Sequence, residues 1–343
     1  MFVLSSDITI GNFRFSGVYE VCIKRSMHSI ADNAIIKLPS IGKIASKNKT
    51  LAETITTGKK FRDGDPVTIK LGYNGILQTE FRGFVNHRSL AMPLTISCDG
   101  YGWLLRRNSV KIFAKVITVE NLLLKAVDQL ERGYKIKIRC TVDFKLTNVQ
   151  IPGCSGFEVI TNIIKYTDGC LTCFFIEPDV LWCGFVYSLV SRGRDMFKSG
   201  MVDYKLGYNV INDNDLKERS VENDPVEVTY SSKLASGEKC SGVSDTRNGI
   251  ARTYNRILNQ VKDATALKEL AIEKAEKLNY SGYEGSIVGF LEPYAAPGAT
   301  ASIADVRYPE RNGKYLIEST EVRFGVNGAR RIVEIGPMMG IAK

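Results

Sequence analysis

The 343-residue chain has only two histidines and no apolar run that approaches the roughly 20 residues needed to span a bilayer. Its first residues, MFVLSSDITIGNF, contain no basic segment followed by a hydrophobic one, so they do not resemble a secretory signal. We therefore expect the protein to be made and folded in a cytoplasm, without inserting into a membrane by itself.

Cysteine is present but not in a pattern that supports chemistry. The eight cysteines are scattered over a long chain, unlike those of a small disulfide scaffold: Cys22, Cys98, Cys140, Cys154, Cys170, Cys173, Cys183 and Cys240. A zinc site at the C-x-x-C pair Cys170/Cys173 would need a second pair or well-spaced histidines, and His28 and His87 have no motif partner. We predict buried structural thiols, surface or structural histidines, and no metal or cofactor.

Recognisable catalytic motifs are also missing. The sequence contains no H-E-x-x-H, P-loop or G-x-G-x-x-G. Residues 153–156, Gly-Cys-Ser-Gly, have the wrong glycine spacing for a nucleophile elbow. The pairs Asp63/Asp65 and Asp213/Asp215 fit turn chemistry, although a glycosidase pair cannot be recognised from sequence. No catalytic, cofactor-binding or metal-binding residue is predicted, and a wall-degrading enzyme remains the alternative.

The composition is that of a folded protein with a basic surface. Hydrophobic residues make up 44% and charged residues 24%, and 343 residues suffice for two or three domains. The net charge of +9 would suit nucleic acid or an acidic partner. Because no RNP-like strand or helix-turn-helix pattern accompanies it, we expect no specific nucleic-acid binding, and a basic nucleic-acid-binding protein is the weaker alternative.

The segment Phe61–Leu90, FRDGDPVTIKLGYNGILQTEFRGFVNHRSL, predicts a β-hairpin. Apolar residues alternate on both sides of Asn74-Gly75, a dipeptide that tolerates the positive φ angles of a type I′ turn. Further strands are predicted at Asn33–Leu38 and Leu94–Cys98. The polar, lysine-rich stretch Gly42–Lys60 is expected to be a long loop with a functional role.

The middle of the chain predicts a small α/β module. Thr118 is a plausible N-cap for a helix over Val119–Glu131. A second helix begins at a capping box, Ser155 to Glu158, and runs to Tyr166. Short strands follow at Leu171–Ile176 and Val180–Tyr187.

The remaining sequence returns to β, with one amphipathic helix at Ala264–Leu278. The Gly/Ser/Lys-rich segment Ser231–Arg247 is expected to be a mobile loop. Strands are predicted at Val226–Tyr230, Gly285–Leu291, Ala301–Ala304, Lys314–Arg323 and Arg330–Ile335.

Two of these stretches resemble a known family. The hairpin pattern x-G-D-x-V-x-I-x-L-G-Y … x-F-x-G-x-V and the later progression P-G … I-x-D … G-x-Y-x-I … G-x-R-R-x-V are similar to the baseplate hub family of contractile-tail phages and related injection machines. That family includes late-control protein D and the hub half of valine-glycine-repeat spike proteins. The resemblance covers most of the chain, as a profile of turns and alternation.

The resemblance implies an α+β, mainly β architecture of two tube-protein-like β-barrels with a small α/β module between them. The implied boundaries are 1–103 for the first barrel, 104–188 for the α/β insert, and 189–343 for the second barrel with its amphipathic helix. Such hubs form homotrimers whose six barrels present pseudo-sixfold symmetry. The implied function is that of a structural adaptor between a hexameric tail tube and a trimeric spike, with baseplate wedge or tape-measure contacts, in a virion or injection-system particle.

Overall fold

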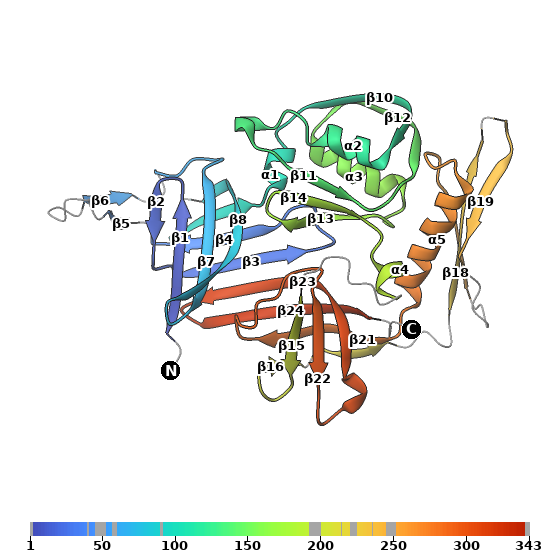
Figure 1. The fold of residues 1–343 in the computed structure, drawn as a ribbon. Coiled ribbons are helices and arrows are strands. Elements are labelled where there is room, and N and C mark those ends of the chain that lie inside the picture. The colour runs from blue at the N-terminus through green and yellow to red at the C-terminus, as the bar shows by residue number, and fades with distance from the viewer. Residues whose placement is uncertain are drawn as a thin grey trace.

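The computed structural model describes residues 3–39, 41–44, 53–56, 60–89, 92–191, 200–213, 215–219, 225–234, 236–244 and 252–339. The fold is mainly β with few helices, as predicted, and a helical middle region lies above two β-regions in Figure 1. No helix within the described ranges is long and apolar enough to cross a membrane.

One 14-stranded sheet runs through both β-regions in the order β16-β21-β24-β23-β3-β4-β9-β8-β7-β1-β2, with β15, β17 and β22 beside this path. The N-terminal strands are β1 (Leu4–Ile10), β2 (Phe13–Phe15), β3 (Glu20–Ser26), β4 (Asn33–Leu38), β7 (Pro66–Tyr73), β8 (Ile76–Ser89) and β9 (Leu94–Asp99). The C-terminal strands are β15 (Met201–Lys205), β16 (Val210–Asn212), β17 (Lys217–Arg219), β21 (Gly282–Gly289), β22 (Thr300–Ala304), β23 (Gly313–Gly325) and β24 (Gly328–Met338).

The two β-regions are joined by backbone pairing. Strand β23 pairs antiparallel with β3, from Ser319 opposite Ser26 to Gly325 opposite Glu20. Among the described residues neither region closes on itself, because β2 pairs only with β1 and β15 only with β22. The expected mainly β class is confirmed, but the two tube-like β-barrels do not occur as closed barrels: 14 described strands of the two regions form one open sheet with two hydrophobic cores.

The predicted hairpin is confirmed as β7 and β8. Asn74 and Gly75 have φ angles of 53° and 82°, as a type I′ turn requires. The side chains of Val67, Ile69 and Phe81 are buried in the N-terminal core. Local sequence therefore predicted the turn and the alternation of the flanking strands.

The prediction of a loop over Gly42–Lys60 is wrong in part. Strands β5 (Ile41–Ile44) and β6 (Glu53–Thr56) pair antiparallel, and this hairpin projects from the body at the left of Figure 1. Residues 45–52 and 57–59 lie outside the described residues.

The middle region is built from α1 (Gly102–Leu105), β10 (Val110–Thr118), α2 (Val119–Ala126), the short 3-10 helix Glu131–Gly133, β11 (Lys137–Cys140), β12 (Lys145–Cys154), α3 (Gly156–Tyr166), β13 (Thr172–Glu177), β14 (Val180–Gly184) and α4 (Tyr187–Val190). Thr118 caps α2 as predicted, since its hydroxyl accepts from the Asn121 N–H. Helix α2 ends at Ala126, five residues earlier than predicted; Asn108 donates to the Ala126 carbonyl at 2.8 Å, and Gln129 has a positive φ of 53° that a helix cannot accommodate.

The core of the middle region also contains side chains from later parts of the chain. Helix α5 (Ala264–Asn279) and strands β18 (Val226–Lys233), β19 (Lys239–Val243) and β20 (Arg252–Ile257) lie at the right of Figure 1, and their buried side chains pack with those of α2 and α3. The amphipathic helix was expected in the second β-region, and this packing corrects that expectation. Strands β18 and β19 also occupy much of the expected loop Ser231–Arg247, whose residues 235 and 245–247 lie outside the described residues.

Candidate functional site

Several of the residues that the sequence singled out for chemistry have structural partners. Ser155 begins α3 through the predicted capping box: its hydroxyl accepts from the Glu158 N–H at 3.2 Å, and the Glu158 carboxylate accepts from the Ser155 N–H at 2.8 Å. This hydrogen bond lowers the pKa of Glu158 below its ordinary value. Asp65 accepts from the Arg62 N–H at 2.7 Å, which is the turn role predicted for it.

The cysteines of the C-x-x-C pair are buried, as predicted. Burial raises the pKa of Cys170 to about 12, so its thiol stays protonated at neutral pH. Cys173 lies opposite Cys183 on neighbouring strands, with the two sulfurs 3.0 Å apart. Within the described ranges, no group of three or more histidine, cysteine or acidic side chains is arranged to hold a metal ion.

The two histidines differ in their surroundings. His87 lies exposed on β8, whereas the Nε2 atom of His28 lies 3.1 Å from a Glu318 carboxylate oxygen. Glu318 also accepts from the hydroxyl of Tyr187 at 2.9 Å. These contacts join the first β-region, the second β-region and α4, so His28 has the structural role predicted for it.

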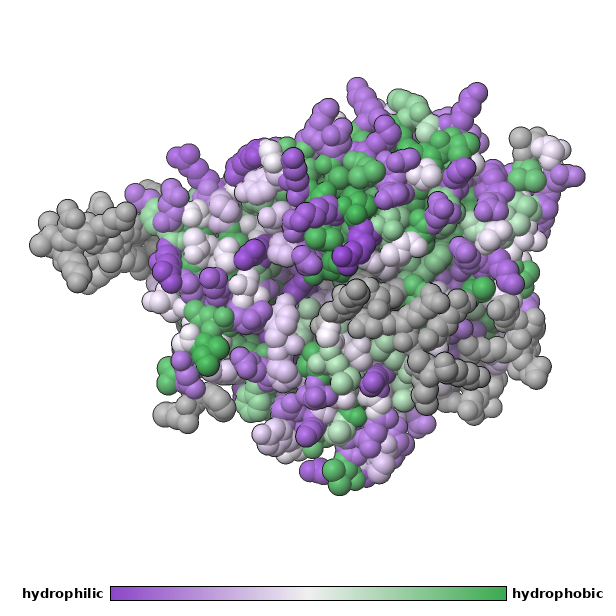
Figure 2. Space-filling view, in the orientation of Figure 1, coloured by the Kyte–Doolittle hydropathy of each residue, from purple (hydrophilic) through white to green (hydrophobic). Residues whose placement is uncertain are grey.

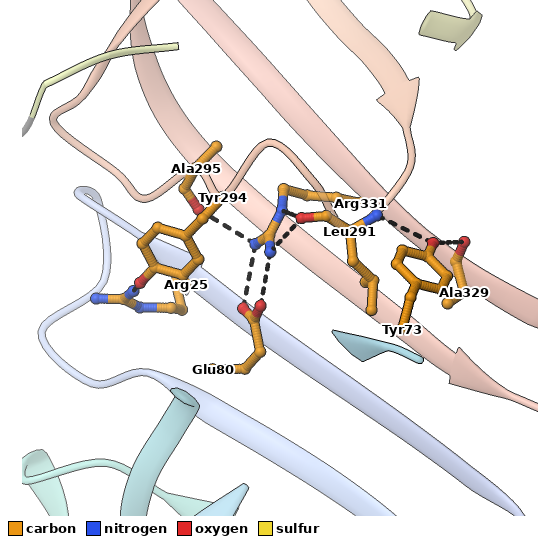
Figure 3. Close-up of polar contacts among 8 residues, drawn as sticks. All are labelled: Arg25, Tyr73, Glu80, Leu291, Tyr294, Ala295, Ala329 and Arg331. Atoms are coloured by element: carbon orange, nitrogen blue, oxygen red, sulfur yellow. Dashed lines mark hydrogen bonds and ion pairs between the residues drawn. The ribbon is translucent and has the colours of Figure 1, made fainter. Parts of the chain in front are cut away.

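The most strongly organised polar site lies between the two β-regions (Figure 3). Arg331 on β24 and Glu80 on β8 form a bidentate ion pair, with N···O distances of 2.7 and 3.2 Å and side chains only 2% and 3% exposed. The guanidinium also donates to the carbonyls of Leu291 and Ala295 at 2.9–3.2 Å. Because both charges are desolvated and fully hydrogen-bonded, the pair fixes the orientation of the two regions.

A second pair of polar residues extends this junction. The Tyr294 ring lies 5.0 Å from the Arg331 guanidinium, and its hydroxyl accepts from Arg25 at 2.9 Å. Arg25 in turn pairs with Asp32 at 3.0 Å. Burial raises the pKa of Asp32 above its ordinary value, although Arg25 opposes this shift.

Tyr73 completes the junction on the other side of Leu291. Its hydroxyl accepts from the Leu291 N–H at 3.3 Å and lies 3.5 Å from the Ala329 carbonyl oxygen. The junction therefore gathers side chains from β3, β7, β8 and β24 around the segment between β21 and β22.

A pocket of about 240 Å³ adjoins this junction, between β8 and the β13–β14 turn. Its lining includes Arg25, Asp32 and Glu80, whose charges are already paired within the protein. These three charges hold the regions together, whereas Arg82 and Glu177 line the same pocket without belonging to the junction.

Sequence reasoning missed this junction. Arg331 was noted only as part of the G-x-R-R-x-V pattern, and Glu80 was not singled out. The alternation of side chains along the strand could have indicated it. Arg331 falls on the same face of its strand as Val333 and Ile335, both of which are buried. A charged residue in phase with a buried face needs a buried partner.

Buried carboxylates also hold the middle region together. Glu273 on α5 accepts from the N–H groups of Val186, Tyr187 and Ser188 at 2.8–2.9 Å, and so begins α4. These hydrogen bonds hold residues 186–188 in the first turn of α4, so β14 ends at Gly184 and does not reach Tyr187 as predicted. Burial raises the pKa of Glu273 even though these donors oppose the shift.

Asp168, which follows α3, provides a second such anchor. Its carboxylate accepts from the hydroxyls of Tyr230 and Tyr254 at 2.9 and 2.7 Å, and it pairs with Arg256 at 2.6 Å. The β18–β20 sheet is thereby attached to the middle region.

Comparisons with known proteins identify the fold. No protein-family model matches the chain, and no curated protein matches it in sequence. A tail protein from Neisseria meningitidis matches 97% of this chain and 96% of its own length, with a TM-score of 0.65 at 14% identity. The 43 kDa tail protein of prophage MuSo2 from Shewanella oneidensis matches 97% of this chain and 98% of its own, with a TM-score of 0.60 at 15% identity.

A third similar structure comes from a secretion system. An E. coli protein, a component of the type VI secretion system with structural similarity to the T4 bacteriophage tail proteins gp27 and gp5, matches 96% of this chain and 76% of its own, with a TM-score of 0.57 at 10% identity. The chain therefore has the fold of phage tail and type VI secretion proteins. The predicted resemblance to the baseplate hub family is confirmed at the level of the fold.

Proposed function

We propose that the chain is a structural baseplate hub protein of a phage tail or a phage-like contractile injection machine, without catalytic activity of its own. The observation that carries this proposal is the extent of the fold match. It includes 97% of this chain and nearly the whole length of two tail proteins, one of them from a prophage. A likeness over the complete length, including the middle region, favours the same architectural role over reuse of a single domain.

The proposed organisation has two tube-like β-regions within 1–103 and 189–343 and a module at 104–188, with which β18–β20 and α5 of the last range pack. In the described chain each β-region ends in strands that pair on one side only, β2 in the first and β15 in the second. Such edges are suited to pairing with a neighbouring subunit. Three subunits would then close a ring with six β-regions around a threefold axis, which adapts a hexameric tube to a trimeric spike.

The partners follow from this symmetry. The ring would bind tail tube protein on one side and spike protein on the other, with wedge or tape-measure proteins as further contacts. It would be located in the virion baseplate or in an injection-system particle. The Glu80–Arg331 pair supports such a role, because an adaptor must hold its two β-regions at a constant angle.

Oligomeric state and symmetry test the proposal. Light scattering during size-exclusion chromatography of the purified chain at micromolar concentration should give a trimer, and electron microscopy of the particle should give a ring with threefold symmetry. A stable monomer in the presence of its tube and spike partners, or a ring of another symmetry, would contradict the hub assignment.

A zymogram tests the enzyme alternative. The protein should produce no cleared band of digested peptidoglycan in the gel. A cleared band that is lost on mutating one carboxylate would favour a tail-associated wall-degrading enzyme.

A further inference from the structure

Strand β10 in the middle region has an open edge. Among the described residues, β10 pairs only with β12, with Val116 opposite Thr147 and Ala114 opposite Val149. The N–H of Thr147 points away from β10, because it donates to the Gln260 carbonyl at 2.7 Å. In an antiparallel ladder the residue opposite such a position also directs its N–H and C=O outward, as does every second residue along the strand. Val116 and Ala114 therefore present free backbone groups.

A groove follows this edge between β10 and α2. One part, of about 610 Å³, is lined by Val116 and Ala114 and by Leu124 of α2. An adjoining part, of about 320 Å³, shares Lys125 and Asp128 with the first and continues to the start of β10. The groove thus runs along the strand edge, which is the geometry that an added strand needs.

The groove is apolar where a binding segment would place its side chains. Val116 and Leu124, which line the groove, are 57% and 49% exposed, a large apolar exposure for two neighbouring residues on adjacent elements. Figure 2 shows hydrophobic side chains, surrounded by hydrophilic ones, on this upper part of the molecule. Contact with a partner would remove this apolar surface from water.

The charges around the groove are mainly positive. Lys125 and Lys145 line its larger part and Lys111 its smaller part, and none of the three forms an ion pair with another described residue. The one carboxylate in the lining, Asp128, accepts a hydrogen bond from the Gln129 N–H at 3.0 Å. The groove therefore offers uncompensated positive charge beside an open strand edge.

We propose that this groove binds an extended segment of a partner protein in which acidic and apolar residues alternate, and that the segment adds as a strand to β10. Its backbone would pair with Ala114 and Val116, its apolar side chains would contact Leu124, and its carboxylates would face the lysines. This inference goes beyond the proposed hub role and does not depend on it, since the groove lies within one chain.

The test uses the full chain and a fluorescein-labelled peptide, Asp-Val-Glu-Val-Asp-Val-Glu, in a fluorescence anisotropy titration. We expect saturable binding that weakens as salt rises from about 50 mM to about 500 mM. The double variant Lys125→Glu/Lys145→Glu should bind about tenfold more weakly or worse. Val116→Pro, which removes one outward N–H without breaking a bond to β12, should also weaken binding.

Matched controls separate recognition from net charge. The variant Lys205→Glu/Lys217→Glu changes the charge equally on exposed residues of the second β-region and should bind like the wild type. A peptide with lysine in place of each acidic residue should not bind. The proposal is wrong if the acidic peptide fails to bind, or if the two double variants lose affinity equally. It is also wrong if Lys125→Glu/Lys145→Glu dissociates an oligomer of the chain, because the groove would then be an interface between copies.

Discussion

Arg331 and Glu80 lie 251 positions apart in the chain and form a buried bidentate ion pair, with N···O distances of 2.7 and 3.2 Å. The pair joins strands from the two β-regions, and the remaining guanidinium hydrogens reach two backbone carbonyls of the loop after β21. An arrangement with so many satisfied donors orients its elements more strictly than apolar packing alone would.

Removal of one partner of this pair should be costly. Glu80→Gln leaves the guanidinium without a counter-charge, and we expect the free energy of unfolding to fall by about 3 kcal/mol or more. The double variant Glu80→Leu/Arg331→Met should recover part of this loss, because it leaves no unpaired charge, although two carbonyls lose their donor. Urea denaturation of the three proteins measures both effects. A single variant within about 0.5 kcal/mol of the wild type would contradict the structural role.

The turn of the first hairpin should depend on a positive φ. Gly75 has a φ of 82°, and a Cβ there would meet no atom within 4 Å, so the effect of a side chain is confined to the backbone. Gly75→Val should therefore destabilise the fold by about 1–3 kcal/mol in thermal denaturation. Gly17→Val is the matched control, since Gly17 is equally uncrowded and lacks a left-handed φ. Equal melting temperatures for both variants would show that the strain is absent.

The Tyr187–Glu318 hydrogen bond should stabilise the protein in a pH-dependent way. Burial raises the pKa of Glu318, but His28 and Tyr187 outweigh it, so the pKa lies below its ordinary value of 4.5. A folded-state pKa below the unfolded value means that the ionised carboxylate stabilises the fold above about pH 4.5, and that this contribution is lost as the pH falls further.

Tyr187→Phe tests this linkage. The variant should lose about 1–2 kcal/mol at neutral pH, because a hydrogen bond to a charged group is removed, and the loss should shrink below pH 4.5. Denaturation curves across this range provide the measurement, and Tyr208→Phe, at a residue that is 83% exposed, provides the control. A loss that stays constant with pH would exclude a contribution from the charge of Glu318.

The β5–β6 hairpin should serve assembly more than folding. Its two strands pair with each other and, among the described residues, with no strand of the main sheet. Replacing residues 41–56 with a short Gly/Ser linker should leave the melting temperature of the isolated chain nearly unchanged but impair its incorporation into particles. Unfolding of the shortened chain would place the hairpin in the core, whereas normal incorporation would contradict its role in assembly.

Several elements could be predicted because their causes lie within a few neighbouring residues. The Asn74-Gly75 turn needs only residues that accept positive φ between two alternating strands. The capping box of Ser155 and Glu158 satisfies the first N–H groups of its own helix. Periodicity likewise located α5, and the absence of recognised motifs led to the prediction that no catalytic residue is present.

Other features were decided by residues distant in sequence, and no local pattern specified them. Strands β10 and β12 were missed, since the evidence for each is its pairing with the other across the intervening α2, 3-10 helix and β11. The apolar stripe of α5 predicted that the helix packs against an apolar surface but did not identify that surface. In the tertiary structure it is the core of the middle region.

By itself, then, the sequence determined the local elements and the β-rich class, because turns, caps and alternation act over a few bonds. Only the tertiary structure decided that β23 pairs with β3 to form one sheet, and that Glu80 meets Arg331. The physical reason is that strand pairing and burial of a charge depend on which distant surface is present to satisfy them.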